Sequence, residues 1–169
     1  KMVELDKEFK LTQEKYPELK AGEVLVKVAG CGVCHTDLSF WHYGVQTKHA
    51  LPLTLGHEIS GTVVAGDNDW LNKTVIIPAV LPCGECELCK KGRSNICRNQ
   101  LMPGNDFQGG FASHIKVPSK FLCEVPKSVL EKYRLEELAV IADAISTPYQ
   151  VVKKSELEAG DLAIVIGVG

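Results

Sequence analysis

The chain has 169 residues, 45% of them hydrophobic and 24% charged, which is enough apolar mass for one real core and excludes intrinsic disorder. Nineteen basic against 21 acidic residues argue against nucleic acid as the main partner. No apolar run approaches the roughly 18 residues of a membrane helix, and the mixed charges of residues 1–6 predict no signal peptide. Seven cysteines, an odd number, do not suit a secreted disulfide framework, so we expect a cytoplasmic protein.

Short strands are predicted over the first two-thirds of the chain. Residues 23–28 alternate apolar and polar side chains, which is the period of a half-buried strand. Similar segments at 61–66, 73–78 and 110–117 are separated by stretches rich in glycine, proline and asparagine. This pattern predicts a mainly β fold with a few helices, built as a small sandwich or a partly open barrel.

The pattern changes to helical spacing further along. We expect one helix over residues 129–144 and a second from Thr147 to about residue 158, with Pro148 in its first turn. Residues 162–166 are almost wholly apolar, as in a strand buried on both faces of a parallel sheet.

Two glycines in the final triplet Gly167-Val168-Gly169 suggest the start of a G-x-G-x-x-G turn. We therefore predict a first domain over residues 1–155 and the truncated beginning of a dinucleotide-binding domain over residues 156–169.

Four cysteines crowd one short stretch. Their spacing suits a single zinc ion, because two-residue gaps let a tight turn bring successive thiolates together. Four thiolates saturate tetrahedral zinc and leave no open position, so this site is predicted to be structural. The alternatives are reduced surface thiols or a redox pair. The residues are Cys83, Cys86, Cys89 and Cys97.

A second group of potential metal ligands lies earlier in the chain. Cys34 and His57 stand in separate glycine-flanked segments, and a third donor further on would complete a zinc site with one open position. Taken singly, each residue has an ordinary alternative. A lone cysteine is usually a small buried hydrophobe, and a lone histidine is more often a hydrogen-bonded core residue.

The order of these motifs resembles that of the zinc-dependent medium-chain alcohol dehydrogenases. Gly32-Val33-Cys34-His35-Thr36-Asp37 is followed by Gly56-His57-Glu58, the four cysteines, and the glycines of 167–169. The resemblance covers essentially the whole chain. It implies a catalytic domain built as a GroES-like, partly open β-barrel, followed by the first strand of a Rossmann α/β domain, with NAD bound between the two domains.

The resemblance also implies the catalytic metal ligands. Cys34 and His57 match the family's first two zinc ligands, and Asp143 stands where the third is usually a cysteine. Together with the four-cysteine cluster, this gives two zinc ions per chain. The alternative for Asp143 is a carboxylate on a helix surface, although its apolar neighbours Ala142 and Ala144 favour burial.

Further site residues follow from the same resemblance. Glu58 would lie beside the metal and adjust the electrostatic field at the ion. Thr36 matches the hydroxyl that hydrogen-bonds the substrate oxygen and passes its proton outward, and Ser39 replaces a relay histidine found in many members. Four residues are expected to contact the cofactor: His35 at the pyrophosphate, Thr147 near the nicotinamide, and Gly167 and Gly169 in the glycine-rich turn.

The implied reaction is hydride transfer from a secondary alcohol to NAD⁺. Residues 49–61 and 102–114 resemble members that act on an acyl-CoA carrying a cyclic alcohol, and residues 76–82 lack the aromatic that narrows many small-alcohol pockets. A small-molecule substrate and a homo-oligomer are expected. Two alternatives stay open: a zinc-stabilised β-domain without catalysis, and a medium-chain dehydrogenase for another cyclic or secondary alcohol.

Overall fold

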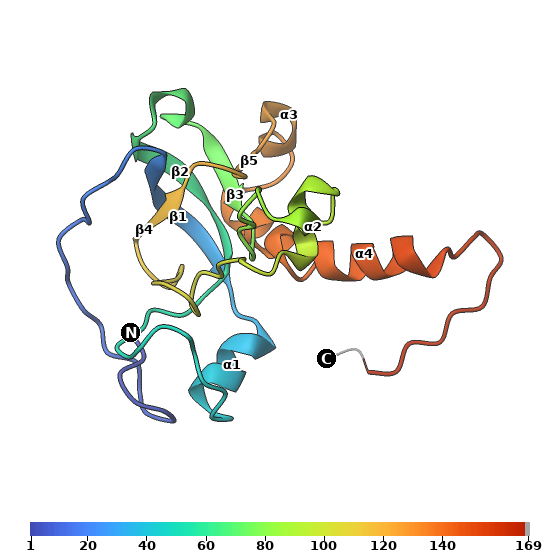
Figure 1. The fold of residues 1–169 in the computed structure, drawn as a ribbon, viewed down its shortest axis with the longest axis horizontal. Coiled ribbons are helices and arrows are strands. Elements are labelled where there is room, and N and C mark those ends of the chain that lie inside the picture. The colour runs from blue at the N-terminus through green and yellow to red at the C-terminus, as the bar shows by residue number, and fades with distance from the viewer. Residues whose placement is uncertain (168–169) are drawn as a thin grey trace.

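A computed structural model describes residues 1–167 and contains one five-stranded antiparallel sheet with the strand order β4-β1-β2-β3-β5 (Figure 1). The mainly β fold is therefore confirmed, and each of the four predicted strands lies within or overlaps an observed one. The strands are β1 (Glu23–Gly32), β2 (Glu58–Gly66), β3 (Thr74–Ile77), β4 (His114–Pro118) and β5 (Cys123–Glu124).

The register of β1 against β2 determines which segments meet at the end of the sheet. The register shifts between Val28 and Gly30, and the pairing continues until Gly32 lies opposite Glu58. The chain leaves β1 just before Cys34 and enters β2 just after His57. Because the two strands are antiparallel, these two residues lie at the same end of the sheet.

Apolar side chains from β1, β2, β3 and β4 form the main core. The alternation along β2 is visible in two adjacent valines, since Val63 is fully buried and Val64 is 39% exposed. This part of β2 therefore buries one face, whereas in β1, where the alternation was predicted, the consecutive residues Val24, Leu25 and Val26 are all buried.

These two valines offer a matched test of the core. We expect Val63→Ala to lower the free energy of unfolding by about 2 kcal/mol, because it removes two buried methyl groups and leaves a cavity. Val64→Ala, one residue away on the other face, should change it by less than about 0.5 kcal/mol. Urea denaturation of both variants measures the difference, and equal losses would contradict this account of the core.

Short helices connect and flank the strands. The predicted single helix over 129–144 is wrong: α3 ends at Leu130, and a separate 3-10 helix, η3, begins at Leu135. The break has a local cause, because Arg134 is extended (φ −74°, ψ 144°) and its backbone N–H donates to the Glu137 side chain at 2.8 Å, which starts a new helix. The helices are α1 (His35–Trp41), α2 (Glu87–Lys90), α3 (Lys127–Leu130) and α4 (Ser146–Ser155), with 3-10 turns η1 (Asn68–Trp70), η2 (Ser94–Ile96) and η3 (Leu135–Ala142).

The 3-10 helix η3 lies against β1 and β2. The Ser60 hydroxyl of β2 donates to the carbonyl of Leu135 at 2.7 Å. Gly30 of β1 lets the backbone of η3 approach closely, since a Cβ there would lie 2.5 Å from the Glu136 carbonyl oxygen. This packing brings Asp143, the residue directly after η3, to the end of the sheet where β1 and β2 meet.

The second predicted helix is confirmed as α4, which projects away from the sheet (Figure 1) and ends at Ser155, where the next residue, Glu156, takes the left-handed conformation. The strand predicted over 162–166 is wrong, because those residues are irregular and highly exposed, Ile166 to 96%. A strand buried on both faces needs neighbouring strands and covering helices, and no residue in the described range 1–167 pairs with it. Gly169 lies outside the described residues.

Among residues 1–167, no helix is both long enough and apolar enough to cross a membrane.

Candidate metal centres

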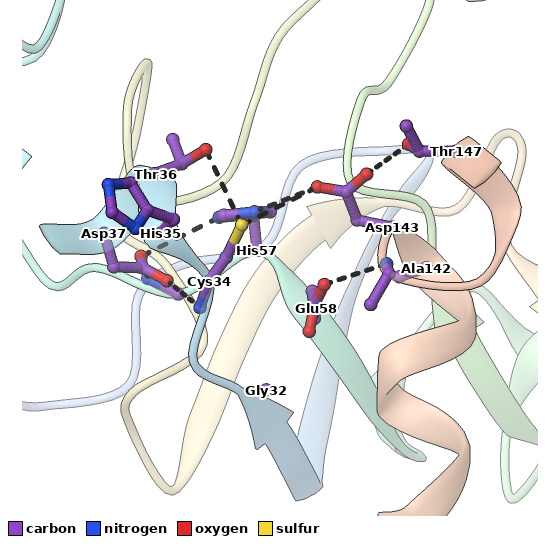
Figure 2. A network of polar contacts seen from close by, with 12 residues as sticks. Gly32, Cys34, His35, Thr36, Asp37, His57, Glu58, Ala142, Asp143 and Thr147 are labelled. Carbon is purple, nitrogen blue, oxygen red and sulfur yellow. Dashed lines mark hydrogen bonds and ion pairs between the residues drawn. The ribbon is translucent and has the colours of Figure 1, made fainter. Parts of the chain in front are cut away.

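Three segments that are distant in the sequence meet at the end of the sheet (Figure 2). Their Cys, His, Glu and Asp side chains place one potential ligand atom each within 4.8 Å of all the others. Asp143 Oδ2 lies 3.4 Å from His57 Nε2 and 4.0 Å from Cys34 Sγ. The structure thus brings together the predicted ligands Cys34, His57 and Asp143, with Glu58 as a fourth donor.

His57 provides a test of whether a metal fits this group. Its side chain is 1% exposed, yet neither ring nitrogen has a hydrogen-bond partner. A buried polar atom without a partner is unfavourable by about 1–3 kcal/mol. Zinc bonds to nitrogen and oxygen of about 2.0–2.1 Å in a tetrahedron place these atoms about 3.3 Å apart, close to the 3.4 Å between His57 Nε2 and Asp143 Oδ2. The donor set therefore fits a zinc ion.

The electrostatics of the site also favour a cation. Burial by itself lowers the pKa of His57, but the neighbouring Asp37 carboxylate and Cys34 sulfur outweigh burial and raise it to about 9. The group accordingly binds positive charge, either as a proton on His57 or as a metal ion.

Asp37 is the site residue that sequence reasoning missed. Its carboxylate is buried and accepts from the backbone N–H of Cys34 at 3.0 Å and of Gly56 at 2.9 Å. Its Oδ1 also lies 3.7 Å from His57 Nδ1. One side chain thereby joins the two loops that carry Cys34 and His57. The sequence contained a signal for this role. In Cys34-x-x-Asp37 the acidic residue stands three positions after the first, which is the spacing of a capping box at the start of a helix.

Glu58 is buried and connects β2 to the segment after η3. Its Oε1 accepts from the backbone N–H of Ala144 at 3.0 Å. A Cβ at Gly32 would lie 2.0 Å from Glu58 Oε2, so a side chain at that position would displace the Glu58 carboxylate. Glu58 therefore helps to hold the turn that carries Asp143, in addition to being a potential ligand.

The remaining predicted site residues lie around this group. Thr36 Oγ1 is 3.6 Å from Cys34 Sγ, and the Thr147 hydroxyl donates to Asp143 Oδ1. His35 is exposed and stacks on Tyr43 with ring centroids 5.7 Å apart.

Two predicted residues are less directly connected to the group. Ser39 Oγ donates to the carbonyl of His35 at 3.1 Å, within α1. Gly167 lies in the irregular segment after α4 and has a φ of 85°. Their predicted roles stay predictions.

A cleft of about 530 Å³ opens beside the group. That volume is in the range of small-molecule sites. Polar side chains supply one part of its lining: Cys34, His35, Glu58, Asp143 and Thr147. Small and apolar residues supply the rest: Val33, Leu38, Val140, Ala144 and Pro148.

The four-cysteine group is the second candidate centre. Cys86 Sγ lies 3.5 Å from Cys89 Sγ and 3.7 Å from Cys97 Sγ, and Cys83 Sγ lies 3.5 Å from Cys97 Sγ and 4.0 Å from Cys89 Sγ. A zinc tetrahedron with bonds of about 2.3 Å has S···S edges of about 3.8 Å. The spacing of the sulfur atoms therefore fits one ion.

The acidities of these thiols differ although the sulfur atoms are close. A backbone N–H of Cys89 stabilises the Cys86 thiolate and lowers its pKa to about 6. Burial and the neighbouring Cys86 sulfur raise the pKa of Cys89 to about 12. Four sulfur atoms in one cluster do not all ionise near neutral pH without a cation to balance them, which again favours a metal.

Comparison with known proteins identifies the fold. Residues 20–127 match the family model described as the alcohol dehydrogenase GroES-like domain. The chain belongs to this family. A solved NAD-dependent alcohol dehydrogenase is similar in structure with a TM-score of 0.78 at 29% identity, covering 89% of this chain and 44% of that one.

Two curated relatives extend the comparison. An alcohol dehydrogenase of Geobacillus stearothermophilus is 34% identical over 179 residues, covering 98% of this chain and 49% of the relative. D-arabinose 1-dehydrogenase (NADP(+)) of Saccharolobus solfataricus is 36% identical over 145 residues, covering 82% and 40%. The chain thus spans about half the length, or less, of the curated relatives it matches.

Proposed function

We propose that the whole protein is a zinc-dependent oxidoreductase that transfers hydride from a secondary alcohol to NAD⁺. The observation that carries this proposal is the meeting of Cys34, His57 and Asp143, in which the buried imidazole of His57 has no hydrogen-bond partner. The adjacent cleft gives a substrate access to the same donors. Family membership and the named activities of the relatives support the reaction class.

In this proposal the two groups hold different ions. The four cysteines would hold a structural zinc with every position filled. Cys34, His57 and Asp143 would hold the catalytic zinc, which acts as a Lewis acid and lowers the pKa of a substrate hydroxyl. One thiolate and one carboxylate would balance the charge of the ion.

The chain's own residues would orient the substrate and move its proton. Thr36, 3.6 Å from the Cys34 sulfur, would accept the proton of the substrate hydroxyl and pass it outward. Ser39 donates to a main-chain carbonyl of α1. Proton exit would therefore depend more on water or on the cofactor ribose than on the hydroxyl of Ser39.

NAD is the proposed cofactor. His35 and Thr147 line the cleft and would contact the pyrophosphate and the nicotinamide. Gly167 and Gly169 would belong to the glycine-rich turn of a dinucleotide-binding domain that starts at residue 156 and follows a catalytic domain over residues 1–155. The end of α4 at Ser155 is compatible with that boundary.

For the substrate we propose 6-hydroxycyclohex-1-ene-1-carbonyl-CoA, oxidised to the 6-oxo product in anaerobic aromatic degradation. The support is the resemblance of residues 49–61 and 102–114 to the dehydrogenase for that compound. These two stretches lie together, since the backbone N–H groups of Gly109 and Gly110 donate to the carbonyls of Thr54 and Gly56 at 2.7 and 2.8 Å. A homo-oligomeric, cytoplasmic enzyme is part of the same proposal.

Zinc content and substrate choice test this function. We expect two zinc ions per chain in the whole protein and faster NADH formation with the cyclic CoA ester than with ethanol. One zinc per chain without dehydrogenase turnover would indicate the non-catalytic β-domain. Two zinc ions with turnover of another alcohol alone would keep the enzyme class and reject the acyl-CoA substrate.

A further inference from the structure

The oxygens of Asp143 have separate partners. Oδ2 points toward the other ligands, 3.4 Å from His57 Nε2. Oδ1 accepts a hydrogen bond from the Thr147 hydroxyl, and the main-chain carbonyl of Asp143 accepts from the Thr147 backbone N–H at 2.8 Å. Figure 2 shows Thr147 on the side of Asp143 opposite to His57. Both polar groups of Thr147 that can donate are therefore directed at Asp143.

The neighbouring hydroxyl of Ser146 does not bond to the carboxylate of Asp143. Ser146 precedes Thr147 in the first turn of α4, and its hydroxyl donates to the carbonyl of Ala142 at 3.1 Å. The first turn thus carries two adjacent hydroxyls, of which one bonds the carboxylate of Asp143 and the other bonds only main chain.

We propose that Thr147 is a positioning residue for the metal centre, which holds Asp143 so that its carboxylate offers a single oxygen, Oδ2. The inference rests on the proposed function and adds a second role for a residue expected near the nicotinamide. A carboxylate binds a metal through one oxygen or through both, and a second oxygen would fill the position that the substrate needs. The hydrogen bond on Oδ1 holds the carboxylate with Oδ2 toward the other ligands and so favours binding through that oxygen alone, which keeps the position open.

This role follows from the carboxylate at position 143. A cysteine ligand has only one donor atom, so it needs no partner to select between two. The hydroxyl of Thr147 should therefore influence the metal when residue 143 is aspartate, and should have little influence when it is cysteine. A general effect of Thr147 on α4 would be the same with aspartate or cysteine at position 143, whereas positioning of the ligand would depend on the aspartate.

Zinc release from the whole protein to a chromophoric chelator tests the proposal. We expect Thr147→Val to release one of the two zinc ions about 10–100-fold more readily, because the carboxylate is no longer held with Oδ2 toward the metal; this is the range typical for partners of metal ligands. The four-cysteine zinc should be released as before. Thr147→Ser should behave as the parent protein because it keeps the hydroxyl, and Ser146→Ala should have no effect. The absorption of a Co²⁺-substituted centre should change with Thr147→Val and be restored with Thr147→Ser.

A double-mutant cycle completes the experiment. In an Asp143→Cys background, Thr147→Val should leave zinc release unchanged. An equal effect in both backgrounds, or tight zinc binding by Thr147→Val alone, would overturn the positioning role. Failure of the proposed function looks different: the parent protein would then hold one zinc, and Asp143→Ala would lose none.

Discussion

Replacing Cys34 with serine in the whole protein is expected to remove one of two zinc ions and to lower NAD-dependent alcohol oxidation by about three orders of magnitude. A serine hydroxyl is a poor zinc ligand, and the Lewis-acid contribution that disappears is worth several kcal/mol. Zinc content measured by mass spectrometry and steady-state turnover record both losses.

The neighbouring Cys31 provides a matched control. Its sulfur lies within 3.7 Å of the carbonyl of Gly32, burial raises the pKa of its thiol to about 12, and it is not part of either donor group. Cys31→Ala should therefore retain two zinc ions and most of the turnover. A Cys34→Ser protein that kept both metal and turnover would contradict the assignment of this centre.

The second large effect is expected at the four-cysteine lobe. Between residues 82 and 100 only Cys97 is buried, so this segment has no apolar core of its own. Metal–sulfur bonds would take the place of that core. We expect Cys97→Ser to lose the structural zinc and to make the lobe susceptible to trypsin at Lys90, Lys91 and Arg93.

Limited proteolysis followed by mass spectrometry measures this change. Cys123→Ser is the control, because Cys123 is exposed and lies outside the cluster. That variant should keep two zinc ions and resist cleavage at the same rate as the parent protein. If Cys97→Ser also resisted cleavage and kept its metal content, the lobe would not depend on zinc.

The sheet was the part of the fold that the sequence predicted best. The apolar residues of 23–28 predicted a strand, and β1 is observed there, although Val24, Leu25 and Val26 are all buried and its two faces therefore do not simply alternate. The single helix predicted over 129–144 is wrong because apolar spacing does not reveal a break: residues 131–134 are not helical, although Leu135 and Leu138 continue the helical period. Residues 162–166 have the composition of a buried strand, but composition cannot form a strand without partners.

The candidate site was predictable only where its residues have a distinctive local spacing. Spacing indicated the four cysteines directly, whereas Asp143 was identified only through resemblance, because an isolated aspartate has no distinctive pattern. The helix α1 and the role of Asp37 were missed. Asp37 acts through contacts with Cys34 and with Gly56, 19 residues further along the chain, and long-range contacts of this kind are not visible in local sequence.

The buried carboxylate of Asp37 has a consequence for how the protein matures. Because it fixes the two loops of Cys34 and His57 by backbone hydrogen bonds, that pocket is preorganised by the polypeptide itself. In the proposed function, an ion bound there would be exchangeable after the chain has folded. In the lobe of residues 83–97 only Cys97 is buried, so an ion bound there would have to arrive while the chain is still acquiring its shape. The two metals of one molecule would then be loaded at different stages of its life.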